Sequence, residues 1–167
     1  MPVRAYIGLG SNQQNPLLQI HNALIALKQI PQTELAGYSR LYRSKPIGPV
    51  DQPDFVNAVA AIDTCLDAHA LLSELQSIEQ QQGRVRNGVR WGPRTLDLDL
   101  LLFGDEQFNT GRLTVPHPGL LQRDFVLYPL YEIAPDLQFN SGELLAELVK
   151  EHPDDELEPL DSPEICY

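Results

Sequence analysis

The chain has 167 residues, of which 43% are hydrophobic and 21% are charged, values that are ordinary for a water-soluble protein. This length suffices for one domain with a sizeable core. The formal net charge of −11 argues against non-specific binding to nucleic acid. No apolar run is long enough to cross a bilayer and the N-terminus lacks a basic, apolar leader, so we expect a cytoplasmic protein.

The acidity is concentrated towards the C-terminus. Residues 132–167 hold eleven of the 23 acidic residues and a single basic residue, Lys150. From residue 153 onwards the segment is also punctuated by proline, which is typical of disordered tails. We therefore expect a folded domain at residues 1–152 and an acidic, flexible tail at residues 153–167. The two cysteines and four histidines match no zinc-ligand spacing.

The first elements of the chain are a predicted strand and a predicted helix. Residues 3–9 are short and apolar, which predicts a strand, and residues 8–12 then turn without the ending of a P-loop or a dinucleotide fingerprint. Asn15 and Pro16 are typical first residues of a helix, and apolar residues then recur at helical spacing. Residues 35–43 predict a second strand.

A stiff, proline-rich loop is predicted at residues 44–54. Loops held by a rigid scaffold often carry binding residues, although a plain connector is an equal alternative. Residues 55–65 are rich in Val, Ala and Ile and predict a strand on which Phe55 and Asn57 share a face. Asparagine is uncommon in strands, so Asn57 is a candidate binding amide.

The second predicted helix covers residues 68–82, with Asp67 as its N-cap. Gln76 and Glu79 lie one turn apart on a face that differs from the apolar stripe. From its position in the sequence alone, Glu79 is by default a solvated acid.

Residues 84–103 combine a basic loop with an alternating strand. The loop contains glycine, proline and no acidic residue, and its four arginines are Arg84, Arg86, Arg90 and Arg94. Leucine then alternates with aspartate, which predicts a strand with Asp97 and Asp99 on one face and leucines facing a core. Neighbouring carboxylates repel unless a cation lies between them, and oxygen ligands suit Mg²⁺. Nearby arginines can grip phosphate oxygens, so the stretch indicates phosphoryl transfer, with a solvated edge strand as the plain alternative.

The remaining elements are shorter. Strands are predicted at residues 107–108 and 113–115, a helix is predicted to begin near Leu120, and the last helix is predicted at residues 142–150. Strands and helices follow one another roughly as β-α-β-β-α-β. This order predicts an α/β (α+β) fold of the ferredoxin-like type, an antiparallel sheet with helices on one face and the other face left for ligands.

Residues 90–101, Arg-Trp-Gly-Pro-Arg-Thr-Leu-Asp-Leu-Asp-Leu-Leu, resemble the signature of the 6-hydroxymethyl-7,8-dihydropterin pyrophosphokinase (HPPK) family of folate biosynthesis. The resemblance extends to residues 6–12, 48–57 and 113–117. Enzymes of this family transfer pyrophosphate from ATP to the hydroxymethyl group of a reduced pterin and release AMP. The resemblance implies ATP and the pterin as ligands and two Mg²⁺ ions as cofactors. We expect a monomer without nucleic-acid or membrane partners.

The resemblance also assigns roles to single residues. It implies catalytic roles for Arg84, Arg94, Asp97 and Asp99, with the two aspartates as metal ligands. The residues implied in pterin binding are Ser44, Ile47, Phe55, Asn57, Trp91 and Phe125. The residues implied in ATP binding are Gln76, Glu79, Arg86, Arg90, Trp91, Leu100, Arg112, Thr114, His117 and Arg123. Lys45, Phe55 and Pro118 depart from the residues that are common at these positions of the family.

Two other functions remain open at this stage. The first is another Mg²⁺-dependent nucleotidyl- or phosphotransferase with the same fold, which would release ADP or pyrophosphate in place of AMP. The second is a non-catalytic binding module whose acidic tail recruits a partner. We also predict that the arginine loop is mobile and closes on ATP, because four cations without acidic neighbours repel one another.

Overall fold

The computed structural model describes residues 2–12, 15–44, 54–82, 96–118, 124–139, 141–151 and 158–160. Within these residues the elements are β1 (Val3–Ser11), α1 (Pro16–Lys28), β2 (Thr33–Tyr38), β3 (Tyr42–Ser44), β4 (Phe55–Thr64), α2 (Ala68–Gln81), β5 (Asp97–Phe103), β6 (Phe108–Asn109), β7 (Thr114–Val115), α3 (Asp124–Ile133), α4 (Leu145–Glu151) and β8 (Glu158–Pro159). No helix of the described part is long and apolar enough to cross a membrane.

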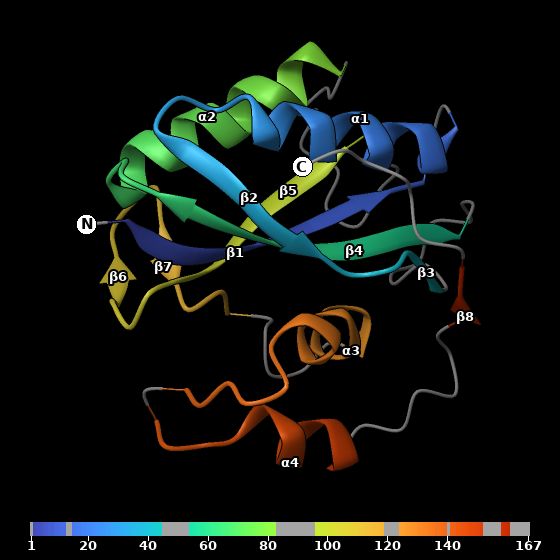
Figure 1. Cartoon of the computed structure of the whole chain (residues 1–167), viewed down its shortest axis with the longest axis vertical. Coiled ribbons are helices and arrows are strands. Elements are labelled where there is room, and N and C mark those ends of the chain that lie inside the picture. The colour runs from blue at the N-terminus through green and yellow to red at the C-terminus, as the bar shows by residue number, and fades with distance from the viewer. Residues whose placement is uncertain are drawn as a thin grey trace.

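The centre of the molecule is an antiparallel sheet with the strand order β5-β1-β4-β3-β8 (Figure 1). β2 also pairs with β4, so β2 and β3 follow one another along the same edge of that strand. β6 and β7 form a separate small hairpin. The prediction of an α/β fold built on an antiparallel sheet is confirmed.

The predicted starts of α1 and α2 are confirmed, whereas α3 begins at Asp124 and not near Leu120, and α4 begins at Leu145 and not at residue 142. The Asn15 side chain accepts a hydrogen bond from the Leu18 N–H at 3.5 Å, with Pro16 in the first turn. Asp67 accepts one from the Ala70 N–H at 2.8 Å. Side chains of this kind satisfy amide groups that have no partner inside the helix, which explains why α1 and α2 begin there.

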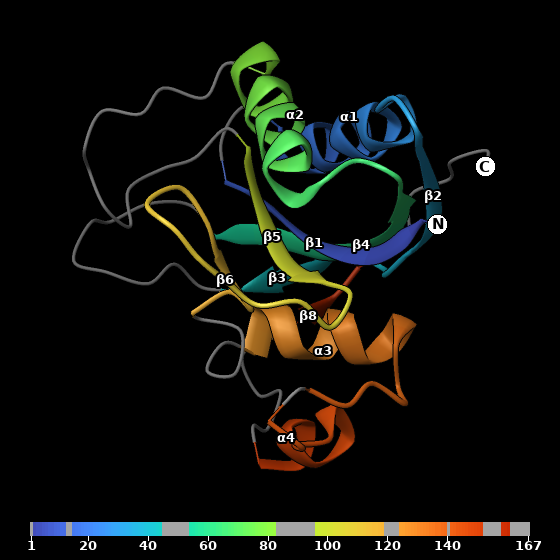
Figure 2. The same ribbon diagram turned by 90° about the vertical axis from the view of Figure 1, so that its left-hand side faces the viewer.

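One core lies between the sheet and the helices α1 and α2. Ile7 and Leu9 of β1, Ile62 of β4 and Leu98 of β5 are buried in it, together with Leu24 of α1. Successive side chains of a strand point to opposite faces, so these residues occupy alternate positions of each strand. The predicted packing of two helices on one face is therefore present (Figure 2).

The opposite face of the sheet is covered in part by α3, with α4 beyond it (Figure 2). A second core contains Val59 and Leu101 from the sheet and Leu127 and Leu130 from α3, all buried. The prediction that helices would occupy one face only is corrected here. The apolar side of α3 needs burial, and the alternate positions of β1, β4 and β5 provide an apolar surface for it.

Two further expectations differ from the structure. The single strand predicted at residues 35–43 is divided into β2 and β3, with Ser39, Arg40 and Leu41 between them. Within the expected tail, β8 pairs with β3, and the Leu160 N–H donates to the Leu41 carbonyl at 2.7 Å. This part of the tail therefore contributes to the sheet.

Candidate active site

The candidate site occupies the end of the α3 face of the sheet that lies away from the second core. Its floor is a row of residues in register across three strands, with Gly10 of β1 opposite Asp97 of β5 on one side and Asn57 of β4 on the other. Two residues earlier on β1, Gly8 lies opposite Asp99. Directly paired residues point to the same face of an antiparallel sheet, so two carboxylates and an amide border the two glycines.

Asp97 and Asp99 lie on the predicted strand and on the same face. Both are partly exposed, whereas the alternating Leu98 and Leu100 are 5% and 3% exposed and belong to the core on the α1 and α2 side. The predicted alternation is therefore confirmed. The side chains of the two aspartates point to the polar end of the face, where a ligand can reach them.

Asn57 is held in place from two directions. It is 5% exposed, and its Nδ2 donates a hydrogen bond to the Ser44 Oγ at 2.7 Å. A Cβ atom on Gly10 would lie 3.1 Å from Asn57 Oδ1. Glycine in a strand often marks such a close approach. β3, β4 and β1 together therefore fix the amide, and Phe55 lies two residues before it on the same face.

Glu79 differs from the default expectation of a solvated acid. Its residue exposure is 2%, and Oε2 accepts a hydrogen bond from the Leu98 N–H at 2.8 Å. Among the described strands β5 lies at the edge of the sheet, so none of these strands pairs with this amide. The carboxylate of α2 therefore anchors β5 between the two aspartates.

His117 lies along the same edge of β5. The backbone N–H of His117 donates to the Leu101 carbonyl at 3.0 Å, and its ring Nε2 is 3.8 Å from Asp99 Oδ1. The side chains of His117 and Asp99 are 24% and 36% exposed, so both border solvent. The imidazole can form an ion pair with Asp99 when it is protonated.

The β6–β7 hairpin carries Thr114, and the turn before β7 brings Arg112 to α2. Arg112 Nη2 donates to Ser73 Oγ at 3.1 Å and to Gln76 Oε1 at 3.5 Å. Thr114 is exposed and pairs with Asn109. Glu79 and His117 thus bond to the outer edge of β5, the edge that faces away from β1, and Gln76 and Arg112 meet on α2. Ser44 and Asn57 lie across the sheet from them.

Several predicted residues fall outside the described part of the chain. These are Ile47, Arg84, Arg86, Arg90, Trp91, Arg94 and Arg123, together with the predicted mobile arginine loop. Phe125 lies in the first turn of α3, and its side chain is not described. Their assignments stay predictions.

The donor set of the site suits a hard cation. Asp97 and Asp99 offer carboxylate oxygens on one partly exposed face, next to glycines that leave room above the sheet. Within the described ranges, no group of three or more His, Cys, Asp or Glu side chains could hold a metal ion. A pair of carboxylates of this kind would fit a Mg²⁺ site in which one or two carboxylates act together with substrate phosphates and water.

The sequence and fold comparisons point to the same class of enzyme. Residues 6–135 match the family model of 7,8-dihydro-6-hydroxymethylpterin-pyrophosphokinase (HPPK). The chain therefore belongs to the HPPK family of pyrophosphokinases.

Individual relatives agree with this assignment. A 2-amino-4-hydroxy-6-hydroxymethyldihydropteridine pyrophosphokinase of Haemophilus influenzae is 53% identical over 91% of this chain and 94% of its own length. The enzyme of the same name from Pseudomonas aeruginosa is 52% identical over 94% of this chain and 96% of its own length. A crystal structure of a Plasmodium falciparum HPPK-DHPS triple mutant with pteroate matches with a TM-score of 0.74 at 13% identity. That match covers 95% of this chain and 47% of the Plasmodium chain, and it supports the fold alone.

Neither Gly10 nor Glu132 stands out in the sequence. Gly10 leaves the space between Asp97 and Asn57, but the sequence predicts a strand that ends at Leu9 and a turn at residues 8–12, whereas β1 continues to Ser11. Glu132 of α3 binds the segment between β2 and β3, and no local pattern indicates such a contact because the partners are about ninety residues apart.

Proposed function

We propose that this enzyme transfers pyrophosphate from ATP to the hydroxymethyl group of 6-hydroxymethyl-7,8-dihydropterin, releasing AMP and the dihydropterin diphosphate, in folate biosynthesis. The observation that carries the proposal is the row formed by Asp97, Gly10 and Asn57 across one face of the sheet. In this row the carboxylate that we propose as a metal ligand and a buried amide lie on either side of a residue without a side chain. The family match and the names of the relatives support the same reaction.

Two Mg²⁺ ions are the proposed cofactors, with Asp97 and Asp99 as their protein ligands. When bound, the ions would supply positive charge to the triphosphate oxygens. The two carboxylates are spaced by the backbone of β5. The Glu79 bond to the Leu98 N–H holds that strand at the edge opposite to its pairing with β1. The two aspartates are therefore held in position before any ligand arrives, which reduces the ordering that binding requires.

The nucleotide is proposed to lie along the outer edge of β5, the edge that faces away from β1. The Leu98 N–H points away from β1 towards Glu79, and backbone groups alternate along a strand, so those of Leu100 face the same edge. The side chain of Leu100 is buried, so this residue would contact the adenine base through its backbone groups. Arg112, Thr114 and His117 approach this edge from the hairpin, next to Gln76 of α2.

Six further residues are proposed as nucleotide contacts from the family resemblance. Arg84 and Arg94 would neutralise the charge that develops as the bond to the α-phosphate breaks. Arg86, Arg90, Trp91 and Arg123 are proposed as additional nucleotide contacts.

The pterin is proposed to bind across the sheet from the nucleotide. The Asn57 amide would read the ring edge, because its Nδ2 bond to Ser44 fixes the plane of the amide. Ile47, Trp91 and the rings of Phe55 and Phe125 would provide apolar and stacking surfaces for the flat bicycle. The hydroxymethyl group would then face the aspartates across Gly10.

The test is AMP release from Mg²⁺–ATP in the presence of the hydroxymethyl-dihydropterin. The Asp97→Ala variant should lose turnover by about 10³-fold or more, because positioned charge is the main aid to phosphoryl transfer. Asp136→Ala is the matched control, since Asp136 is an exposed acid in the turn after α3. Undiminished AMP release by Asp97→Ala would refute the metal assignment, and ADP or pyrophosphate as the product would refute the reaction.

The cytoplasmic location and the monomeric state belong to the same proposal. Light scattering after size-exclusion chromatography should give the mass of one chain, 18.7 kDa. A mass near twice that value would refute the monomer.

A further inference from the structure

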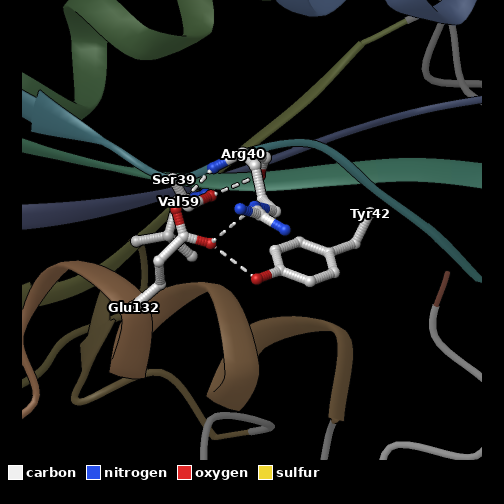
Figure 3. A network of polar contacts seen from close by, with 5 residues as sticks. All are labelled: Ser39, Arg40, Tyr42, Val59 and Glu132. Atoms are coloured by element: carbon white, nitrogen blue, oxygen red, sulfur yellow. Dashed lines mark hydrogen bonds and ion pairs between the residues drawn. The ribbon is translucent and has the colours of Figure 1, made fainter. Parts of the chain in front are cut away.

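Glu132 of α3 joins this helix to the segment that leads into β3. Its Oε2 accepts a hydrogen bond from the Arg40 N–H at 2.9 Å, and its Oε1 accepts one from the Tyr42 hydroxyl at 2.6 Å (Figure 3). The Arg40 Nε also lies 3.8 Å from Oε1. One carboxylate therefore binds the backbone before β3 and a side chain within it.

The break between β2 and β3 has a second anchor on β4. The Ser39 N–H donates to the Val59 carbonyl at 2.8 Å, and the Val59 N–H donates to the Ser39 Oγ at 3.0 Å. Ser39 is fully buried. Ser39 thus fixes the end of β2 to the sheet, and Glu132 fixes the next residues to α3 (Figure 3). The two anchors determine where β3 begins.

The position of β3 matters for the site because β3 carries Ser44. Tyr42 pairs with Asn57 in the sheet, and Ser44 lies two residues further along on the same face. The Ser44 Oγ then accepts the bond from Asn57 Nδ2 at 2.7 Å. A shift of Tyr42 would therefore move Ser44 relative to the amide that it orients.

The same contact joins β3 to α3, the helix that carries the predicted pterin residue Phe125. α3 begins at Asp124, and Phe125 lies in its first turn. Leu127 and Leu130 are fully buried against the sheet, so apolar packing keeps α3 attached without Glu132. The contribution of Glu132 is to fix β3 relative to α3.

We propose that Glu132 is a positioning residue for the pterin side of the site, acting through Tyr42 and Arg40 on the Ser44–Asn57 pair. This inference rests on the proposed function, in which Ser44 and Asn57 border the pterin. Glu132 binds its partners at the β2–β3 break and acts on the substrate only through them.

The experiment compares Glu132→Ala and Glu132→Gln with the parent enzyme by calorimetry. The ligands are 6-hydroxymethyl-7,8-dihydropterin, titrated in the presence of Mg²⁺ and α,β-methylene-ATP, and the nucleotide analogue alone. Glu132→Ala should weaken pterin binding about three- to fivefold, because the contacts of Glu132 are solvent-exposed and an exposed charged contact contributes less than a buried one. Nucleotide affinity should stay within about twofold. Glu132→Gln should recover part of the loss, because its amide oxygen can still accept one bond.

Three further variants make the result specific. Glu151→Ala, which removes an exposed acid at the end of α4, is the matched control and should bind both ligands as the parent does. Tyr42→Phe should weaken pterin binding, and adding it to Glu132→Ala should cost little more because the two residues share one contact. Tyr42→Phe and Glu132→Gln carry the test if Glu132→Ala fails to fold.

The outcomes separate this inference from the proposed function. Equal weakening of nucleotide and pterin binding in the Glu132 variants, or no weakening at all, overturns the positioning role. Asn57→Ala is measured beside them. If it weakens pterin binding while the Glu132 variants do not, the inference alone fails. If Asn57→Ala leaves pterin binding unchanged, the proposed pterin site fails as well.

Discussion

The space above Gly10 gives the sharpest test of the candidate site. We predict that Gly10→Ala weakens pterin binding, whereas Gly8→Ala, two residues earlier on the same face, does not. A Cβ on Gly10 would lie 3.1 Å from Asn57 Oδ1, whereas a Cβ on Gly8 would lie 3.4 Å from the nearest atom of the Leu101 side chain. Ordinary van der Waals contacts of a Cβ atom lie at 3.4–4 Å, so the first substitution forces a movement and the second does not.

The expected loss of pterin affinity depends on how far the Asn57 amide can move. The hydrogen bond from Nδ2 to Ser44 Oγ is short, at 2.7 Å, and the residue is 5% exposed. The amide can therefore move only by stretching that bond or displacing its neighbours. A disturbed hydrogen bond costs about 0.5–1.5 kcal/mol, equivalent to about a two- to tenfold loss of pterin affinity. Alanine otherwise stabilises by about 0.4–1 kcal/mol through the unfolded chain, and overpacking costs about 1–3 kcal/mol. Gly10→Ala should therefore unfold at a free energy about 1–3 kcal/mol below that of Gly8→Ala.

Two measurements check this prediction. Calorimetry with 6-hydroxymethyl-7,8-dihydropterin and a Mg²⁺–nucleotide analogue gives the affinities, and urea denaturation gives the free energies of unfolding. Parent-like pterin affinity and stability in Gly10→Ala would refute the close approach between β1 and the Asn57 amide. An equal loss in Gly8→Ala would show that any added methyl group on this face disturbs the site.

Two further predictions concern the supports of the site. Glu79→Ala should lower the free energy of unfolding by about 2–3 kcal/mol and reduce turnover, because the edge amide of β5 loses a charged acceptor, and Glu79→Gln should retain part of both. Urea denaturation and AMP release measure these effects, and parent-like values for Glu79→Ala would contradict them. Leu24→Ala should lower the free energy of unfolding by about 2–5 kcal/mol because Leu24 is fully buried. The exposed Leu17→Ala should change it by less than about 0.5 kcal/mol, and comparable losses in both would contradict the packing.

The sequence specified the local features because neighbouring residues alone produce them. Alternation of leucine and aspartate requires only the two-residue period of a strand, so Asp97 and Asp99 could be placed on one face before any fold was known. Capping by Asn15 and Asp67 depends on bonds that span three residues. The order of strands and helices then predicted the antiparallel sheet with α1 and α2 on one side.

Tertiary structure decided which distant residues meet. The register of β1 with β4 and β5 places Gly10 between Asn57 and Asp97, and no local pattern encodes a register between strands so far apart in the chain. Burial of Glu79 depends on β5 being an edge strand whose amide faces α2, which converts an expected surface acid into an anchor. The apolar side of α3 needed a partner, and among the described residues its core with Val59 and Leu101 lies on the face of the sheet that also carries Asp97 and Asn57. The sequence by itself thus determined the chemical groups of the site, and packing of the whole chain determined their arrangement, because contacts between distant segments form only when all layers bury their apolar surfaces together.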